Sequence, residues 1–339
     1  MTNNPASRES RPLPAGKARD AAGVTSQQAL IIGIGDYGGR CSALPNAPAD
    51  AKSLADVLSE EYGFVVTLLL DSQAEKAAIE KAIVCALQAK PDVRWLFYFA
   101  GHGAVLDETG CLIVEDAQVE DVNTCLTLPW LLEHCRRSTV GEVLVILDAC
   151  YSGRALVRGE SLVDETTSIG ERRVRQLISS GNPSQPVLDG GGSGHSIFTQ
   201  ALLDALHGWS GVHEANGALR FSRLLDHLVY EIPARLHELG LSAATQQPIG
   251  GYILGNSDRR EFVFHSQVAG SCRKALPTNE RSSLWYIQRH PTCATRPAGL
   301  VPERGGNGSA TSRYSQFSAS TAASHVVAVA MLVPPLMPE

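Results

Sequence analysis

Several features that define whole classes of proteins are missing from this 339-residue chain. No apolar run reaches the ~20 residues of a membrane-spanning helix, and the apolar run 326–333 is short and followed by two prolines. Residues 1–28 lack the apolar segment of a secretory signal peptide. None of the eight cysteines forms a Cys-x-x-Cys pair, which disfavours a structural zinc site. We therefore expect a cytoplasmic protein with reduced thiols, no metal site and no membrane partner.

Excess positive charge is also missing. Charged residues make up 19% of the chain, and the formal net charge is -6. This balance gives no support for nucleic acid as a partner. Apolar residues make up 44%, which is enough to build a sizeable core in one large domain or two smaller ones.

Apolar strand-like segments alternate with helix-like segments through the first two thirds of the chain. Strands are predicted at 29–35, 64–70, 93–100, 143–148, 174–180, 250–254 and 261–264, with a hairpin arm at 111–115. Helices are predicted at 48–60, 75–89, 128–135, 197–207 and 221–236. The alternation predicts an α/β fold with a mostly parallel central sheet and helices on both faces.

Composition divides the chain into three parts. Residues 1–27 are expected to form a disordered leader, and residues 28–267 a single domain interrupted by a mobile loop at 154–172. Residues 268–339 are rich in Ser, Gly, Pro, Arg and Thr without a clear period, and they are expected to form a disordered tail.

Two strand-like segments end in reactive side chains that lie 48 residues apart. The segment 95–103 ends in Gly-His102-Gly103, and the segment 143–153 contains Asp148-Ala-Cys150 and ends at a glycine. Open α/β sheets place their active sites at the carboxyl ends of parallel strands. The pattern therefore predicts an imidazole and a thiol at one edge of the sheet.

A cysteine after a buried strand is more often a small core residue than a nucleophile. The matching histidine motif, the turn-forming residues after Cys150 and the nearby Asp148 favour the nucleophile. An adjacent imidazolium can lower a thiol pKa from ~8.5 to ~3.5–7.5. The glycines beside His102 would let a substrate carbonyl approach the backbone. The N–H groups of Gly103 and Cys150 would then form an oxyanion hole.

These motifs resemble the caspase-fold cysteine peptidases of the C14 group, and most of all their bacterial metacaspase-like branch. The resemblance covers residues 28–265 and implies a caspase-like (caspase-hemoglobinase) fold. It further implies that His102 is the general base, that Cys150 is the nucleophile, that proteins or peptides are the substrates and that no cofactor is required. By the same resemblance, residues 28–153 correspond to the large subunit and residues 173–267 to the small subunit.

The resemblance also implies a substrate preference. In metacaspases, acids at the positions of Asp148 and Asp50 line a pocket for Arg or Lys at P1, the residue before the cleaved bond. A partly buried carboxylate is poorly solvated until a cation pairs with it. For Asp50 the alternative is an exposed residue near the start of a helix. The usual third pocket acid is absent, because Ser184 occupies its place.

Some features allow two interpretations. Acidic residues after His102 could bind an activating Ca²⁺, although such residues are usually only solvated; they are Asp107, Glu108, Glu115, Asp116, Glu120 and Asp121. His195 is interpreted as a residue of the turn before a helix. An alternative function is a catalytically inactive caspase-like interaction module in a signalling or defence assembly. The sequence assigns no oligomeric state.

Basic residues follow the nucleophile in a segment predicted to be mobile. They are Arg154, Arg158, Arg172, Arg173 and Arg175. Exposed flexible loops are where proteolytic cleavage concentrates. Self-cleavage in this segment would resemble the maturation of the family, and the alternative is simply a basic surface loop.

Overall fold

The computed structural model describes residues 26–150, 173–181, 194–241, 246–253 and 260–267. All of them fall within one compact unit, residues 1–294. The expected leader, apart from residues 26 and 27, lies outside the described residues, as do the expected loop 154–172 and the expected tail 268–339.

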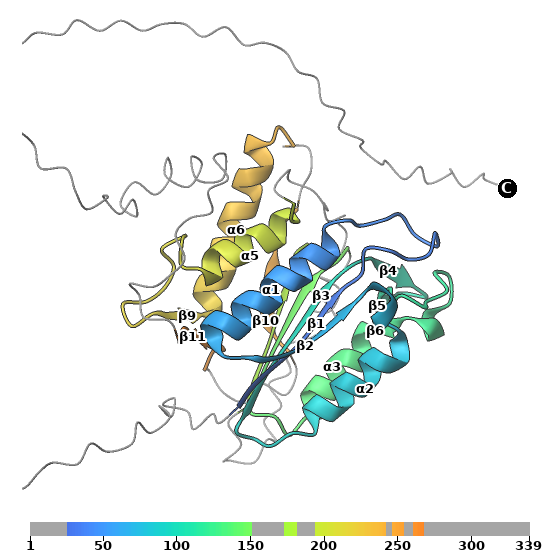
Figure 1. Ribbon diagram of the computed structural model, residues 1–339, viewed down its shortest axis with the longest axis horizontal. Helices are drawn as coiled ribbons and strands as arrows, with labels where there is room; N and C mark the ends of the chain where they lie inside the picture. Colours follow the sequence, from blue (N-terminus) through green and yellow to red (C-terminus); the bar gives the residue numbers. More distant parts are fainter. Residues whose placement is uncertain (1–25, 151–172, 182–193, 242–245, 254–259, 268–339) are drawn as a thin grey trace, which may run out of the picture. The chain divides into compact units, whose positions relative to one another are not determined.

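A six-stranded sheet forms the centre of the fold (Figure 1). In spatial order its strands are β10 (Ile249–Tyr252), β8 (Val174–Ser179), β7 (Glu142–Asp148), β3 (Val93–Ala100), β1 (Ser26–Gly33) and β2 (Val65–Leu70). Neighbouring strands are parallel, except that β10 runs antiparallel to β8. Every residue of β3, β7 and β8 is buried, as expected for strands that are covered on both faces.

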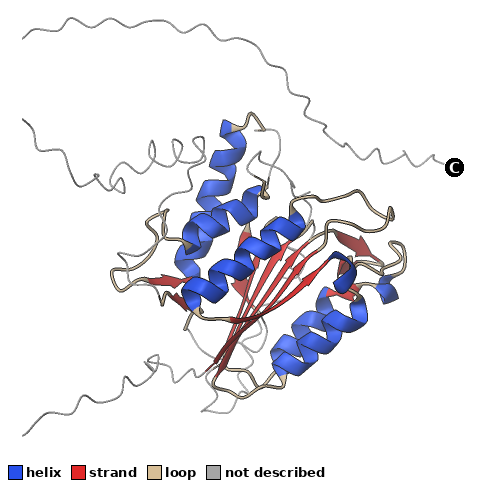
Figure 2. Cartoon of the chain, in the orientation of Figure 1, coloured by secondary structure: helices blue, strands red, loops and turns tan. Residues whose placement is uncertain are grey.

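Helices cover both faces of this sheet (Figures 1 and 2). On one face lie α1 (Ala47–Tyr62), α5 (Ile197–Leu206) and α6 (Phe221–Glu238). On the other face lie α2 (Lys76–Leu87) and α3 (Leu128–Arg137). The predicted α/β fold with helices on both faces is confirmed. Each predicted helix is present, with ends displaced by at most a few residues.

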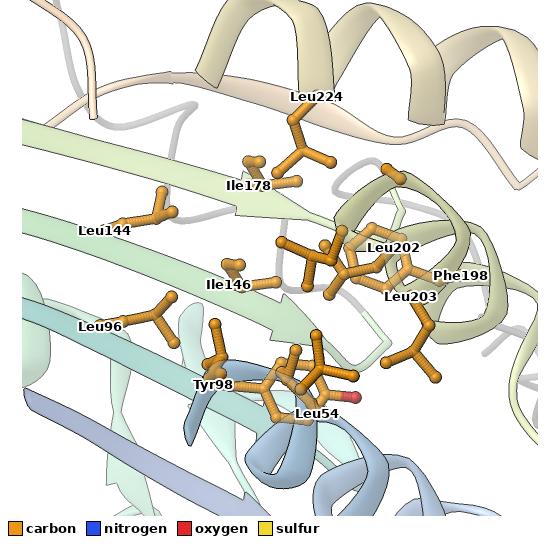
Figure 3. Close-up of a cluster of buried hydrophobic side chains, with 14 of the residues drawn as sticks. Leu54, Leu96, Tyr98, Leu144, Ile146, Ile178, Phe198, Leu202, Leu203 and Leu224 are labelled. Carbon is orange, nitrogen blue, oxygen red and sulfur yellow. The ribbon is translucent and has the colours of Figure 1, made fainter. Parts of the chain in front are cut away.

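The two-residue period of the central strands separates the core into two halves. On β3, Leu96 and Tyr98 belong to the half under α1, α5 and α6, whereas Phe97 belongs to the half under α2 and α3. On β7, Leu144 and Ile146 face the first half. Figure 3 shows sheet residues of this half opposite helix residues, among them Leu54, Phe198, Leu202, Leu203 and Leu224. By the same period, Asp148 at the end of β7 points toward α1 and α5.

Two smaller sheets flank the main one. The first contains β4 (Gly103–Leu106), β5 (Thr109–Leu112) and β6 (Leu126–Thr127), all antiparallel. The second pairs β9 (Ala218–Arg220) with β11 (Val263–His265). The hairpin arm predicted at 111–115 is present, although it begins and ends earlier as β5. The sequence did not predict β9, because three residues are too few to show a period.

One basic residue that was assigned to the mobile segment lies in the core instead. Arg175 is the second residue of β8 and is fully buried. Its guanidinium donates hydrogen bonds to the carbonyl oxygens of Cys135, Ser138 and Val140, at 2.8, 3.2 and 2.6 Å. The prediction that Arg175 belongs to an exposed loop is therefore wrong, because these carbonyl groups solvate the charge inside the fold.

Candidate active site

The two reactive residues follow adjacent parallel strands. His102 lies two residues after β3, and Cys150 lies two residues after β7, in a register that pairs Ala100 with Asp148. Both residues line one cavity of about 70 Å³. Its lining is Leu44, Ala47, Asp50, Ala100, Gly101, His102, Asp148, Ala149, Cys150 and Ser196. The fold therefore brings together the predicted dyad and both predicted pocket acids.

The His102 imidazole is oriented by the segment that follows β1. Its Nε2 lies 2.8 Å from the carbonyl oxygen of Ser42. Because a carbonyl oxygen can only accept, Nε2 donates, and the neutral ring then has its lone pair on Nδ1. The backbone N–H of His102 donates to the Tyr37 hydroxyl at 2.8 Å, and the two rings lie 5.0 Å apart. These contacts leave Nδ1 as the proton-accepting atom.

The glycine after His102 is required by packing within the protein. A Cβ on Gly103 would lie 2.1 Å from the Cys150 carbonyl oxygen, and one on Gly101 would lie 2.6 Å from the Tyr37 hydroxyl. These glycines therefore make room for the protein's own atoms, and the expectation that they also admit a substrate carbonyl stays a prediction.

The direction of the Gly103 N–H follows from the β4–β5 register. Ile113 donates its N–H to the His102 carbonyl, which makes 102 and 113 a hydrogen-bonded pair. The next pair, Gly103 and Leu112, is then of the non-hydrogen-bonded kind. The Gly103 N–H therefore points away from β5.

Asp148 is a buried carboxylate with one engaged oxygen. It is 6% exposed. Its Oδ2 accepts hydrogen bonds from the Ser196 hydroxyl at 2.5 Å and the Thr199 hydroxyl at 2.9 Å. Its Oδ1 is buried and has no hydrogen-bond partner among the described residues. Burial, and then the nearby charge of Asp50, raise the pKa of Asp148 to about 7.

Asp50 belongs to the first turn of α1 and is 1% exposed, so its interpretation as an exposed helix-start residue is wrong. Its Oδ1 lies 2.7 Å from Nδ1 of His195, and the Ser196 N–H lies within 3.3 Å of both of its oxygens. Burial raises the pKa of Asp50, and the hydrogen bonds from His195 and Ser196 oppose that rise.

The start of α5 supplies residues that the sequence did not place in the site. Ser196 is the N-cap of α5, and its hydroxyl oxygen accepts from the Thr199 N–H. His195 precedes it, as the turn interpretation required, but the predicted role omitted its contact with Asp50. The signal was the segment Gly194–Thr199, in which a histidine precedes a Ser-x-x-Thr cap. Ser184 lies outside the described residues.

Three of the six acids proposed for calcium have contacts with other residues. Glu115 pairs with Arg40, Asp116 accepts the N–H of Lys76, and Asp121 accepts the N–H of Asn123. Within the described ranges, no three or more His, Cys, Asp or Glu side chains are grouped to hold a metal ion. No described helix is both long enough and apolar enough to cross a membrane.

With its fold and site described, the chain can be compared with known proteins. Residues 26–237 match the caspase domain model of the C14 peptidases. The match covers more than half of the chain, and the protein therefore belongs to the caspase domain family. The predicted caspase-like fold is confirmed, and membership suggests a cysteine peptidase.

One curated relative is an uncharacterized protein, y4kE, of Sinorhizobium fredii (strain NBRC 101917 / NGR234). It is 26% identical over 217 residues, which are 60% of this chain and 58% of the relative. The chain thus spans little more than half the length of that relative.

Two solved structures resemble the fold. Caspase-1 from Spodoptera frugiperda has a TM-score of 0.51 at 17% identity, over 71% of this chain and 90% of that one. Protein GSU0716 from Geobacter sulfurreducens has a TM-score of 0.46 at 20% identity, over 75% of this chain and 98% of that one. At these identities the caspase-1 likeness concerns the fold alone.

Proposed function

We propose that this protein is a cysteine endopeptidase of the metacaspase-like kind, which cleaves peptide bonds after Arg or Lys. Cys150 is the nucleophile, His102 is the general base and then the general acid, and Asp148 and Asp50 line the pocket for the P1 side chain. The observation that carries the proposal is the buried Asp148 Oδ1. It has no hydrogen-bond partner among the described residues, and Asp148 lines the same cavity as His102 and Cys150.

The chemistry follows from the His102 tautomer. Nδ1 of His102 takes the thiol proton, which leaves a thiolate beside an imidazolium. The thiolate attacks the substrate carbonyl, and the Gly103 and Cys150 N–H groups stabilise the oxyanion. The intermediate collapses to a thioester as the imidazolium protonates the leaving amine. His102 then deprotonates water, which hydrolyses the thioester and returns the thiol.

A positively charged P1 side chain fits the pocket around Asp148 better than a neutral one does. An unpaired buried carboxylate is costly, and a guanidinium or ammonium at Oδ1 would restore both the hydrogen bond and the charge balance. The interaction-module alternative makes no use of this unpaired oxygen.

The test is hydrolysis of fluorogenic peptides that end in Arg, Lys or Asp. We expect cleavage after Arg and Lys, and a loss of roughly 10⁴-fold or more in Cys150→Ala. Cys85→Ala changes an exposed thiol on α2 and serves as the matched control. Equal hydrolysis by Cys150→Ala would refute the dyad. A preference for Asp would refute the pocket, and absence of hydrolysis would favour the interaction module.

A further inference from the structure

The two acids of the pocket have different surroundings, although they line the same cavity. Asp50 has a partner at each oxygen, because Oδ1 faces His195 and the Ser196 N–H approaches both oxygens. Asp148 uses Oδ2 toward Ser196 and Thr199, and its Oδ1 makes no hydrogen bond in the described part of the chain, although the Ser180 hydroxyl lies near enough to help lower the pKa of this acid. Of the two acids, therefore, only Asp148 has a carboxylate oxygen, Oδ1, that makes no hydrogen bond and can accept one from a ligand.

His195 accounts for this difference. Its Nδ1 lies 2.7 Å from a carboxylate oxygen, so Nδ1 bears a proton and donates to Asp50. The imidazole is 21% exposed and thus keeps contact with water, whereas the Asp50 side chain is 1% exposed. The hydrogen bonds from His195 and Ser196 occupy the Asp50 oxygens and favour the ionised form of Asp50. None of the described residues that line the cavity is Lys or Arg, so no other basic side chain compensates Asp148 there.

Asp50 and Asp148 line the same cavity, and two negative charges there repel each other. The charge of Asp50 is one cause of the raised pKa of Asp148. If both acids were unpaired, one of them would hold a proton rather than bind a cation. Because His195 and Ser196 already occupy the oxygens of Asp50, an arriving cation binds at Asp148 Oδ1, and its positive charge offsets the repulsion between the two acids.

We infer that His195 is a specificity-determining residue. Its hydrogen bond occupies Asp50, so that Oδ1 of Asp148 alone binds the P1 cation. The inference rests on the proposed function, because it concerns the same pocket. The pocket then accepts one positive charge, as on Arg or Lys. It discriminates against citrulline, which has nearly the shape of arginine without the charge.

The experiment measures binding separately from catalysis. In the Cys150→Ala background, calorimetry compares a peptide that ends in arginine with the same peptide that ends in citrulline. We expect Asp148→Asn to reduce the preference for arginine by roughly tenfold or more, and Asp50→Asn to reduce it by less than about threefold. The amide oxygen introduced by Asp50→Asn can still accept from His195 and Ser196, so the two variants are matched in size and chemistry.

Two changes at position 195 test the histidine itself. His195→Ala frees Asp50, so we expect the preference for arginine to survive in His195→Ala combined with Asp148→Asn, although Asp148→Asn alone removes it. His195→Asn keeps a donor near Asp50, so with Asp148→Asn it should again remove the preference. If His195→Ala does not fold, the contrast between Asp50→Asn and Asp148→Asn still decides the inference.

The outcomes separate this inference from the proposed function. Equal losses in Asp50→Asn and Asp148→Asn, with the active protein still cleaving after Arg, would overturn the inference and leave the peptidase assignment intact. The expected binding pattern in a protein that hydrolyses no peptide would support the inference and refute the peptidase. Equal binding of the two peptides before any pocket change would overturn the inference.

Discussion

At the scale of single residues, Asp148 combines a cost to folding with a use in binding. Burial and the charge of Asp50 raise its pKa to about 7, far above the ordinary value of 3.8. The folded protein therefore holds a proton on Asp148 that the unfolded chain has already released. For such a group, the free energy of unfolding of the protein falls as the pH rises from the pKa of the unfolded chain to that of the folded protein, here from about 4 to about 7.

Replacing Asp148 with Asn is expected to make the protein more stable at neutral pH and worse at binding arginine. The free energy of unfolding of wild type should fall relative to Asp148→Asn between about pH 4 and 7, by at most a few kcal/mol. Above that window the difference should stay constant. Urea titrations of both proteins at several pH values measure it. A wild type that gains stability relative to Asp148→Asn in this window would contradict the raised pKa.

The direction of the Asp148 side chain could be predicted from the sequence, but the contact of His195 with Asp50 could not. Asp148 extends the alternation of Leu144 and Ile146, so its direction follows from the strand period alone. Asp50 and His195 lie 145 residues apart and meet only because α1 and the start of α5 pack on the same face. No local period encodes such a contact.

At the scale of elements, the hairpin after His102 fits closely against the nucleophile segment. The backbone of β4 approaches Cys150 so closely that a Cβ at Gly103 would lie 2.1 Å from its carbonyl oxygen. The same N–H that points away from β5 is the proposed oxyanion donor. A shift of β4 therefore disturbs the nucleophile and the oxyanion hole together.

Gly103→Ala is expected to reduce kcat by roughly 10²-fold or more, because one oxyanion donor and the Cys150 backbone must both move. Gly101→Ala is a matched comparison, since its Cβ would meet the Tyr37 hydroxyl and the Phe99 ring instead of the Cys150 backbone. Kinetics with an arginyl peptide and circular dichroism separate activity from folding. Full activity in Gly103→Ala would show that the backbone contact is dispensable.

The same group of short strands contains a thiol with a lowered pKa. Cys111 on β5 and Cys125 just before β6 share a hydrogen bond, which lowers the pKa of Cys125 to about 7 and raises that of Cys111. Both thiols are buried, with 2% and 1% exposure. Thiolate character without access does not give reactivity.

Iodoacetamide at pH 7 is therefore expected to modify Cys150 first. We expect Cys150 to react at least about tenfold faster than the exposed Cys85, and Cys125 to react only when the protein unfolds. A time course of peptide mapping by mass spectrometry gives the rate for each thiol, and His102→Ala should reduce the rate at Cys150 alone. Labelling of Cys125 ahead of Cys150 would show that the short strands open readily.

At the scale of the whole molecule, the segment expected to be cleaved joins two adjacent strands of one sheet. β8 lies between β7 and β10, and it pairs in parallel with β7 from residue 142 onward. Arg175 adds hydrogen bonds from β8 to the carbonyl groups of residues 138–141, which precede β7. The parallel direction of these strands could be expected from the alternation of strands and helices. The anchoring by Arg175 could not, because a buried arginine has the same sequence signal as an exposed one.

Self-cleavage is therefore expected after Arg154, Arg158, Arg172 or Arg173 but not after Arg175, which is fully buried. The two fragments should stay together in native buffer, because the pairing of β7 with β8 and the Arg175 hydrogen bonds do not depend on the cut segment. Mass spectrometry of the incubated protein locates the cuts, and gel filtration with and without denaturant tests the association. Cys150→Ala should remain intact. Cleavage after Arg175, or separation of the fragments without denaturant, would contradict the continuity of this sheet.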